Sequence, residues 1–221
     1  MRPSTATAAE YARAEPPAPG TPWRDAGYCV VDLETTGLDP RRDEIISYAA
    51  IPIDEGRVRP GGLVSGLVQP RRMPRADSMR IHGLRSADLA SAPRLHEALD
   101  SLLGALAGRA LVAHVAWVEE GFLGRALRVH GVRLRGEAID TAGLAEVVFG
   151  RRPAADPLRL TAVASQLGLP VHRPHHAEGD ALTTAQVFIA LATRLERAGG
   201  PQTVRSLTLT GRRLKRVRLR R

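Results

Sequence analysis

The order of apolar segments along the chain is the feature that most restricts its fold. Three short runs rich in β-branched residues come first, at 28–33, 44–53 and 63–69, and clusters of Gly, Pro and Asp separate them. Beyond residue 93, apolar residues at helical spacing alternate with short apolar runs. Neighbouring strands followed by strand-helix alternation predict an α/β domain in which helices pack on a mixed sheet.

The later elements follow from the same periodicity. The segment 93–106 carries leucines at helical spacing, and Pro93 suits the first turn of a helix. The other expected elements are a strand at 110–114, a helix at 118–129, a strand ending at Ile139, and helices at 141–148, 160–167 and 178–197. The pattern therefore predicts five strands.

Composition predicts one folded domain with short tails. A chain of 221 residues is long enough for a single α/β domain with a substantial core. Residues 1–24, rich in Ala, Pro and Thr, are interpreted as a flexible leader, residues 25–200 as the domain, and residues 201–221 as a basic tail. No apolar run approaches the length of about 18 residues that crosses a bilayer, and no signal peptide is evident. We therefore expect a cytoplasmic protein.

The positive charge is concentrated at the C-terminus. The chain has a net charge of +9, and residues 212–221 hold seven basic side chains and no acidic ones, which leaves +2 for the rest. Such an arm attracts any polyanion, but a solvated tail without a partner explains the composition equally well. Charge alone therefore assigns no partner to the domain.

The first candidate functional residues are two carboxylates at the end of the first strand, in the segment Asp32-Leu33-Glu34-Thr35-Thr36-Gly37. Because side chains alternate across a strand, Asp32 and Glu34 project from one face while Leu33 points into the core. Adjacent carboxylates repel and need a proton, a cation or a basic partner. Hard ions such as Mg²⁺ or Mn²⁺ prefer oxygen ligands. The spacing is common on protein surfaces, so it favours a metal site only together with other residues.

A second group of candidates precedes the last long helix, in the segment His175-His176-Ala177-Glu178-Gly179-Asp180. A histidine on this loop can fold over a carboxylate in the first turn of the helix. An imidazole, with an unperturbed pKa of about 6.5, can take a proton from water beside a metal ion. The alternative is a polar loop in which the helix dipole favours Asp180 at the helix start.

A third acidic position lies between these segments. Glu119 and Glu120 fall in the first turn of the helix expected at 118–129. One carboxylate can cap the helix electrostatically while the other faces a site. Either residue alone has an ordinary explanation.

Together the three segments resemble the DEDDh (DnaQ-like) exonucleases, a family that includes the proofreading epsilon subunit of bacterial replicative polymerase. The first family motif, Asp-x-Glu-Thr-Thr-Gly, is intact at 32–37, and the third, His-x-Ala-x-x-Asp, is present at His175, Ala177 and Asp180. The segments Ile81-His82-Gly83-Leu84 and Asp140-Thr141 resemble two lesser marks of the family. The resemblance covers about residues 27–195.

The second motif departs from the family pattern. Where the family reads His-Asn-Ala-x-Phe-Asp, this chain reads His114-Val115-Ala116-Trp117-Val118-Glu119. The carboxylate is kept at Glu119 but extended by one methylene. Val115 and Val118 replace the family's asparagine and phenylalanine. The resemblance therefore implies a displaced metal ligand and an altered grip on the substrate.

The resemblance implies a ribonuclease H-like fold, in which helices flank a mixed five-stranded β-sheet. It implies a metal-dependent 3′-5′ exonuclease that hydrolyses phosphodiester bonds at the 3′ end of single-stranded nucleic acid and releases nucleoside 5′-monophosphates. The implied site holds two divalent ions, Mg²⁺ or Mn²⁺, on Asp32, Glu34, Glu119 and Asp180, with His175 as the base. His176 competes for that role, but the register of Ala177 favours His175. The implied substrate-binding residues are Thr35, Thr36, Leu38, His82 and His114.

The expected partner is nucleic acid with a free 3′ end, with DNA favoured over RNA. A polymerase or another replication or repair protein is a further candidate. Two alternatives stay open on the sequence: a non-catalytic nucleic-acid- or polymerase-binding module with the same fold, and an RNA-directed 3′-5′ exoribonuclease. No sequence feature reads the 2′-hydroxyl that separates the two nucleic acids.

Overall fold

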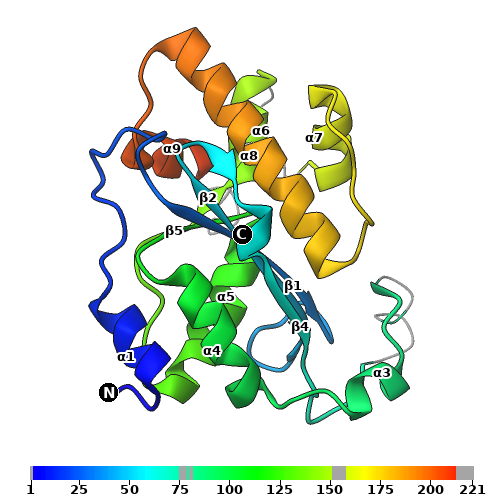
Figure 1. Ribbon diagram of the computed structural model, residues 1–221. Coiled ribbons are helices and arrows are strands. Elements are labelled where there is room, and N and C mark those ends of the chain that lie inside the picture. The colour runs from blue at the N-terminus through cyan, green and yellow to red at the C-terminus, as the bar shows by residue number, and fades with distance from the viewer. Residues whose placement is uncertain (1, 75–78, 80–81, 151–157, 213–221) are drawn as a thin grey trace.

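The computed structural model describes residues 2–74, 79, 82–150 and 158–212. A mixed sheet crosses the molecule, with α8 (Ala177–Gly199) on one face and α4 (Leu95–Leu106) on the other (Figure 1). The five predicted strands are present as β1 (Tyr28–Thr35), β2 (Ile45–Asp54), β4 (Val64–Leu67), β5 (Ala110–Ala113) and β6 (Ile139–Asp140). The sequence does not predict the sixth, β3 (Arg57–Val58), because two residues are too few to show a period.

The strand order brings two chain segments together at one end of the sheet. The order is β3-β2-β1-β5-β6, and β4 pairs with β2. β1 is antiparallel to β2 but parallel to β5, and β5 is parallel to β6. The carboxyl ends of β1 and β5 therefore lie at the same end of the sheet. This end carries the Asp32–Gly37 motif of β1 and the loop that leads from β5 into α5 (Trp117–Ala126).

Side-chain alternation in β1 divides the core between the two faces of the sheet. Cys29, Val31 and Leu33 belong to the core on the side of α4 and α5. Tyr28 and Val30 belong to the other core, together with Phe188 of α8, on which the Tyr28 ring packs. By the same alternation, Asp32 and Glu34 lie on the α8 side.

The remaining helices agree closely with the predicted pattern. α6 (Thr141–Val148) and α7 (Leu160–Leu167) have the expected bounds. The helix expected at 118–129 is α5, which continues as a 3-10 turn, η2 (Leu127–His130). The short elements α3 (Ser86–Ala90) and η1 (Pro60–Gly62) complete this part of the fold. No helix in the described ranges combines the length and the apolarity needed to span a bilayer.

The segment predicted to be a flexible leader, residues 1–24, contains a helix that packs on the domain. Residues 6–13 form α1 (Ala6–Arg13), and the Thr5 hydroxyl caps its start by accepting a hydrogen bond from Ala8 N at 3.1 Å. Tyr11 is 3 % exposed, and its hydroxyl accepts a hydrogen bond from Arg135 N at 3.1 Å. α1 packs against α4. With only Ala8 and Tyr11 buried, α1 has too few apolar residues to show a helical period.

The folded domain also extends beyond residue 200, where the tail was expected to begin. α9 (Val204–Gly211) buries Val204 and Leu207 and packs against α6. The N-terminal segment runs beside it, because Trp23 N donates to Gln202 O at 3.0 Å and Val204 N donates to Thr21 O at 3.1 Å. Residues 213–221 of the predicted basic tail lie outside the described residues, so only the start of the tail is corrected.

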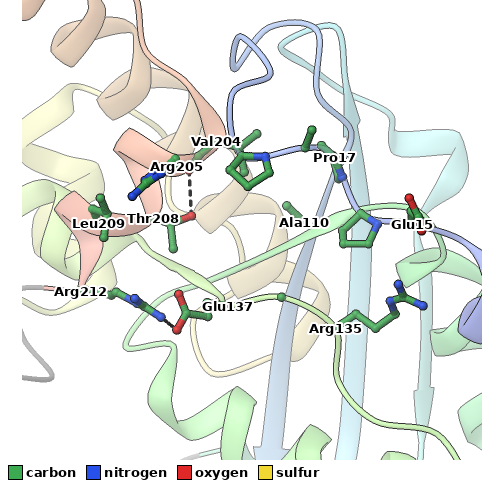
Figure 2. A pocket seen from close by; sticks show the side chains of 14 residues that line it. Glu15, Pro17, Ala110, Arg135, Glu137, Val204, Arg205, Thr208, Leu209 and Arg212 are labelled. Atoms are coloured by element: carbon green, nitrogen blue, oxygen red, sulfur yellow. Dashed lines mark hydrogen bonds and ion pairs between the residues drawn. The ribbon is translucent and has the colours of Figure 1, made fainter.

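The two terminal segments together line a cavity of about 800 Å³ (Figure 2). Pro17 and Glu15 lie on one side, and Val204, Thr208 and Leu209 of α9 lie on the other. Ala110, at the amino end of β5, also lines this cavity. The cavity is therefore at the opposite end of the sheet from Asp32 and Glu34.

Candidate active site

Three carboxylates converge at the carboxyl end of β1. Oxygens of Asp32, Glu34 and Asp180 all lie within 4.8 Å of one another. Asp32 and Glu34 share a face of β1, and Asp180 comes from the first turn of α8, which packs on that face. All three side chains are half-buried. The fold thus joins two motifs that are almost 150 residues apart in sequence.

The electrostatics of this group disfavour three negative charges. Burial, followed by the charges of Glu119, Glu34 and Asp180, raises the pKa of Asp32 well above its ordinary value. Burial, followed by the charge of Asp180, raises the pKa of Glu34 from 4.5 to about 7. A bound cation would reverse both effects, because it favours the ionised carboxylates.

Glu119 lies beside this group but outside the set of three. It is 5 % exposed, and its Oε2 has no hydrogen-bond partner among the described residues. Burial raises the pKa of Glu119, and the charges of Asp140, Glu120 and Glu34 raise it further, while a backbone hydrogen bond lowers it. A buried carboxylate oxygen without a partner is costly unless it is protonated or holds a cation.

The loop before α5 places Glu119, and Asp140 fixes this loop. Asp140 Oδ1 accepts hydrogen bonds from Val115 N and Ala142 N, both at 3.0 Å. Val115 has a φ of 61°, a left-handed conformation that is rare for a β-branched residue. Burial raises the pKa of Asp140 to about 6, although the backbone hydrogen bonds it accepts act in the opposite direction. The sequence marks Asp140 only as a lesser family feature, and its supporting role depends on these contacts.

His175 lies on the loop that enters α8. Its backbone N donates to Asp180 Oδ2 at 2.9 Å, its φ is 61°, and its side chain is exposed. The charges of His175 and His176 both lower the pKa of Asp180, against burial, which raises it and is the largest effect. His175 thus sits beside one of the three converging carboxylates, with its ring open to solvent.

Gly179 is a site residue that the sequence prediction missed. A Cβ at this position would lie 2.2 Å from His172 O and 2.6 Å from Arg173 O, so only glycine lets the histidine loop pack against the start of α8. A glycine near the start of a helix, between Glu178 and Asp180, could have indicated such a contact, because it costs helix stability of about 1 kcal/mol relative to alanine.

The residues after Glu34 shape a turn at the mouth of the site. The Thr35 hydroxyl donates to Gly37 O at 2.6 Å. The Thr36 hydroxyl donates to Asp43 Oδ1 and accepts from Glu44 N, both at 3.1 Å, and so closes the loop between β1 and β2. Leu38, at the tip of this loop, is 69 % exposed. These contacts give both threonines a structural role, and their predicted substrate contacts stay a prediction.

The two histidines predicted to bind substrate have protein partners. His114 Nε2 donates to Leu158 O at 2.7 Å, and its Nδ1 lies 2.9 Å from the Thr141 hydroxyl. Burial lowers the pKa of His114 to about 4, so the ring is neutral and Nδ1 accepts from Thr141. His82 is 3 % exposed, and its Nδ1 accepts from Leu84 N at 3.1 Å. Contacts of either ring with a substrate stay a prediction.

The donor set fits a divalent cation. It consists of carboxylate oxygens, which Mg²⁺ and Mn²⁺ prefer, and it includes the unpartnered Glu119 Oε2 beside three converging carboxylates. The described residues offer no cysteine at this site, and the free thiol of Cys29 is buried within the core. The arrangement is therefore typical of a hard-cation site.

Known proteins similar in sequence to this chain include exonucleases and subunits of DNA polymerase III. The family model RNase_T, described as an exonuclease, matches residues 29–188. The DNA polymerase III subunit epsilon-like protein of Rhodobacter capsulatus is 36 % identical over 182 residues, which are 81 % of this chain and 25 % of that protein. DNA polymerase III subunit epsilon of Treponema pallidum is 31 % identical over 177 residues, which are 78 % of this chain and 80 % of that protein.

A solved structure agrees with the fold. Exonuclease X in complex with 5′ overhanging duplex DNA matches with a TM-score of 0.64 at 23 % identity, over 83 % of this chain and 99 % of that chain. The chain spans about a quarter or less of the first curated relatives it matches. The family match covers most of the chain, from β1 into α8, and includes all four carboxylates. The chain belongs to the RNase_T exonuclease family, with the DnaQ-like, ribonuclease H-like fold that its motifs indicate.

Proposed function

We propose that this chain is a metal-dependent 3′-5′ exonuclease that releases nucleoside 5′-monophosphates from single-stranded nucleic acid. The observation that carries the proposal is the convergence of Asp32, Glu34 and Asp180 beside the unpartnered oxygen of buried Glu119. None of the four carboxylates forms an ion pair within the described ranges, an arrangement that is unfavourable in a protein that has no use for a cation. The family match supports the same conclusion.

In the proposed site, Asp32, Glu34, Glu119 and Asp180 hold two divalent ions, Mg²⁺ or Mn²⁺. When bound, such ions supply a water of lowered pKa and stabilise charge on a phosphate. Glu119 is a methylene longer than the aspartate usual at its position, so its carboxylate extends farther from the start of α5. The set of three converging carboxylates excludes Glu119, which is consistent with a shifted metal ligand.

His175 acts as the general base in this proposal. Its imidazole takes the proton of the attacking water, the water oxygen bonds to phosphorus, and the bond from phosphorus to the 3′ oxygen of the preceding nucleotide breaks. Asp180 holds the backbone of His175 in place through the hydrogen bond from His175 N. Exposure of the ring leaves room for substrate and for proton exchange with solvent.

DNA is the proposed substrate, and Thr35, Thr36, Leu38, His82 and His114 line the proposed pocket for the terminal nucleotide. The relatives named DNA polymerase III epsilon and the exonuclease X complex with DNA support DNA over RNA. The relatives named for the epsilon subunit of DNA polymerase III support association with a polymerase or another replication or repair protein. Leu38 is the most exposed of these residues and offers an apolar surface to a base.

The test compares single-stranded DNA and RNA of the same sequence, each labelled at the 5′ end. With Mn²⁺, the wild-type protein should shorten the DNA one nucleotide at a time and release nucleoside 5′-monophosphates. His175→Ala should lower kcat by about 10² to 10⁴, and Asp32→Ala should abolish turnover. Glu10→Ala, which changes an exposed residue of α1, is the control. Binding without turnover in the wild type would support the non-catalytic alternative, and faster loss of RNA would reverse the substrate assignment.

A further inference from the structure

A second cavity, of about 640 Å³, lies near the same end of β1 but on the opposite face of the sheet. Ile45 and Val68 line it, and both belong to the core on the side of α4 and α5. The start of α4 and the outer part of α5 complete its walls. We call it the arginine groove, after Arg71, Arg94 and Arg125, which line it.

The arginine groove carries a net positive charge. Besides the three arginines, His96 lines it, and Glu44 is the one acidic residue among its lining residues. The carboxylate of Glu44 is already engaged, because its Oε2 accepts from Arg71 N at 2.9 Å and from Arg72 N at 3.2 Å. Within the described ranges, neither the Arg71 nor the Arg94 side chain forms an ion pair. Both side chains are exposed and are available to an anion.

The cavity in Figure 2 differs in this respect. Its Arg212 pairs with Glu137, its Arg135 donates to Ala12 O, and Glu15 adds a second acidic group. Its Arg205 is exposed and forms no ion pair within the described ranges, but the three arginines of this lining face two glutamates, which leaves a net charge of +1. The lining of the arginine groove has three arginines and one glutamate, a net charge of +2, so its excess of positive charge is the greater of the two.

The arginine groove is linked to the acidic site through α5 and the loop between β1 and β2. Arg125 is six residues beyond Glu119 on α5, a rise of about 9 Å. Arg125 Nη1 donates to Pro40 O at 2.8 Å and lies 3.4 Å from Asp43 O, so it ties α5 to this loop. The loop between β1 and β2 thus runs from the end of β1, beside the acidic site, to Glu44 in the wall of the arginine groove.

We propose that the arginine groove binds the phosphodiester backbone of the substrate strand upstream of its 3′-terminal nucleotide, an inference that rests on the proposed function. Guanidinium groups suit this ligand, because they pair with phosphate oxygens and are always charged. Packed layers of secondary structure lie about 10 Å apart. A strand that passes from the α8 face of the sheet to the α4 face crosses two such spacings, so its path is on the order of 20 Å. That length corresponds to about six stacked nucleotides at ~3.4 Å each. Oligonucleotides shorter than this do not reach the groove.

The test uses Arg71→Ala/Arg94→Ala and leaves Arg125 in place, because Arg125 also holds the loop. The matched control, Arg194→Ala/Arg205→Ala, removes the same charge from exposed positions near the far end of α8 and on α9. The substrates are single-stranded 3-mer and 12-mer DNA, a 12-mer strand with a recessed 3′ end in a duplex, and the p-nitrophenyl ester of thymidine 5′-monophosphate, which has no upstream strand.

The groove variant should raise KM for the single-stranded 12-mer several-fold, with no change in KM for the 3-mer and little change in kcat for either. The slope of log affinity for the 12-mer against log salt should fall by about 1.4, which is ~0.7 for each lost phosphate contact on a single strand. The control should keep the wild-type slope. Salt-dependent binding is measured by fluorescence anisotropy in Ca²⁺, so this arm does not depend on turnover.

Three results would overturn the proposal. An unchanged salt slope would show that the groove does not contact the strand. An effect confined to the recessed duplex would assign the groove to the complementary strand. An equal loss on the nucleotide ester would show damage to the site itself. A wild-type protein that hydrolyses neither the ester nor any oligonucleotide would instead refute the proposed function, and the binding measurement would still decide the occupant of the groove.

Discussion

Glu34 makes the stability of the metal-free protein depend on pH. Its pKa is 4.5 as an ordinary glutamate and about 7 in the folded protein, because it is buried next to Asp180. Below pH 4.5 both the folded and the unfolded chain hold the proton, so the carboxyl has no effect on stability. As pH rises towards 7 the unfolded chain releases the proton first, and the free energy of unfolding falls until the folded protein also ionises.

The size of the effect follows from the shift in pKa. A shift of about 2.5 units at 1.36 kcal/mol each corresponds to roughly 3 kcal/mol of lost stability above pH 7. For a chain of this length each kcal/mol changes Tm by about 2 to 4 °C, so Tm should fall by roughly 6 to 12 °C. The raised pKa values of Asp32 and Glu119 act in the same direction.

Thermal unfolding of the wild type and of Glu34→Gln, in EDTA from pH 5 to 8.5, measures this effect. The variant should match the wild type near pH 5, where Glu34 is protonated, and should be more stable than the wild type at pH 8. Added Mn²⁺ should raise the Tm of the wild type much more than that of the variant. Glu10→Gln, an exposed change on α1, should follow the wild type at every pH. Parallel curves for the wild type and Glu34→Gln would refute the conclusion that burial and the charge of Asp180 raise the pKa of Glu34.

Three further predictions concern the supporting structure. Val115→Asn should raise Tm by a few degrees, because asparagine tolerates a φ of 61° and a left-handed conformation costs other residues about 1 to 2 kcal/mol; a lower Tm would contradict this explanation. Asp140→Ala should lower the free energy of unfolding in urea by about 2 to 4 kcal/mol, because Val115 N and Ala142 N lose their acceptor, whereas Asp140→Asn should keep most of the stability; equal losses would exclude this role. Tyr11→Ala should cost about 3 kcal/mol in the same assay, and an unchanged midpoint would mean that residues 1–24 do not support the domain after all.

Much of the fold could be predicted because its main elements carry local patterns. The alternation in β1 fixes which side chains share a face, so Asp32 and Glu34 could be paired from sequence, and the long apolar periods of α4 and α8 could be located closely. α1 and α9 could not be found in this way. Each is eight residues long and is stabilised by contacts with distant parts of the chain, such as Tyr11 with Arg135 and Val204 with Thr21.

The sequence by itself determined which residue types are available for chemistry, because the motifs around Asp32 and Asp180 are contiguous and their spacing fixes local geometry. Only the tertiary structure decided their arrangement. It placed Glu119 beside the three converging carboxylates but outside their set, and it engaged both ring nitrogens of His114 in the protein. It also gathered arginines from three separate segments into one groove. Distances between segments remote in the chain depend on how strands and helices pack, and no local pattern encodes them.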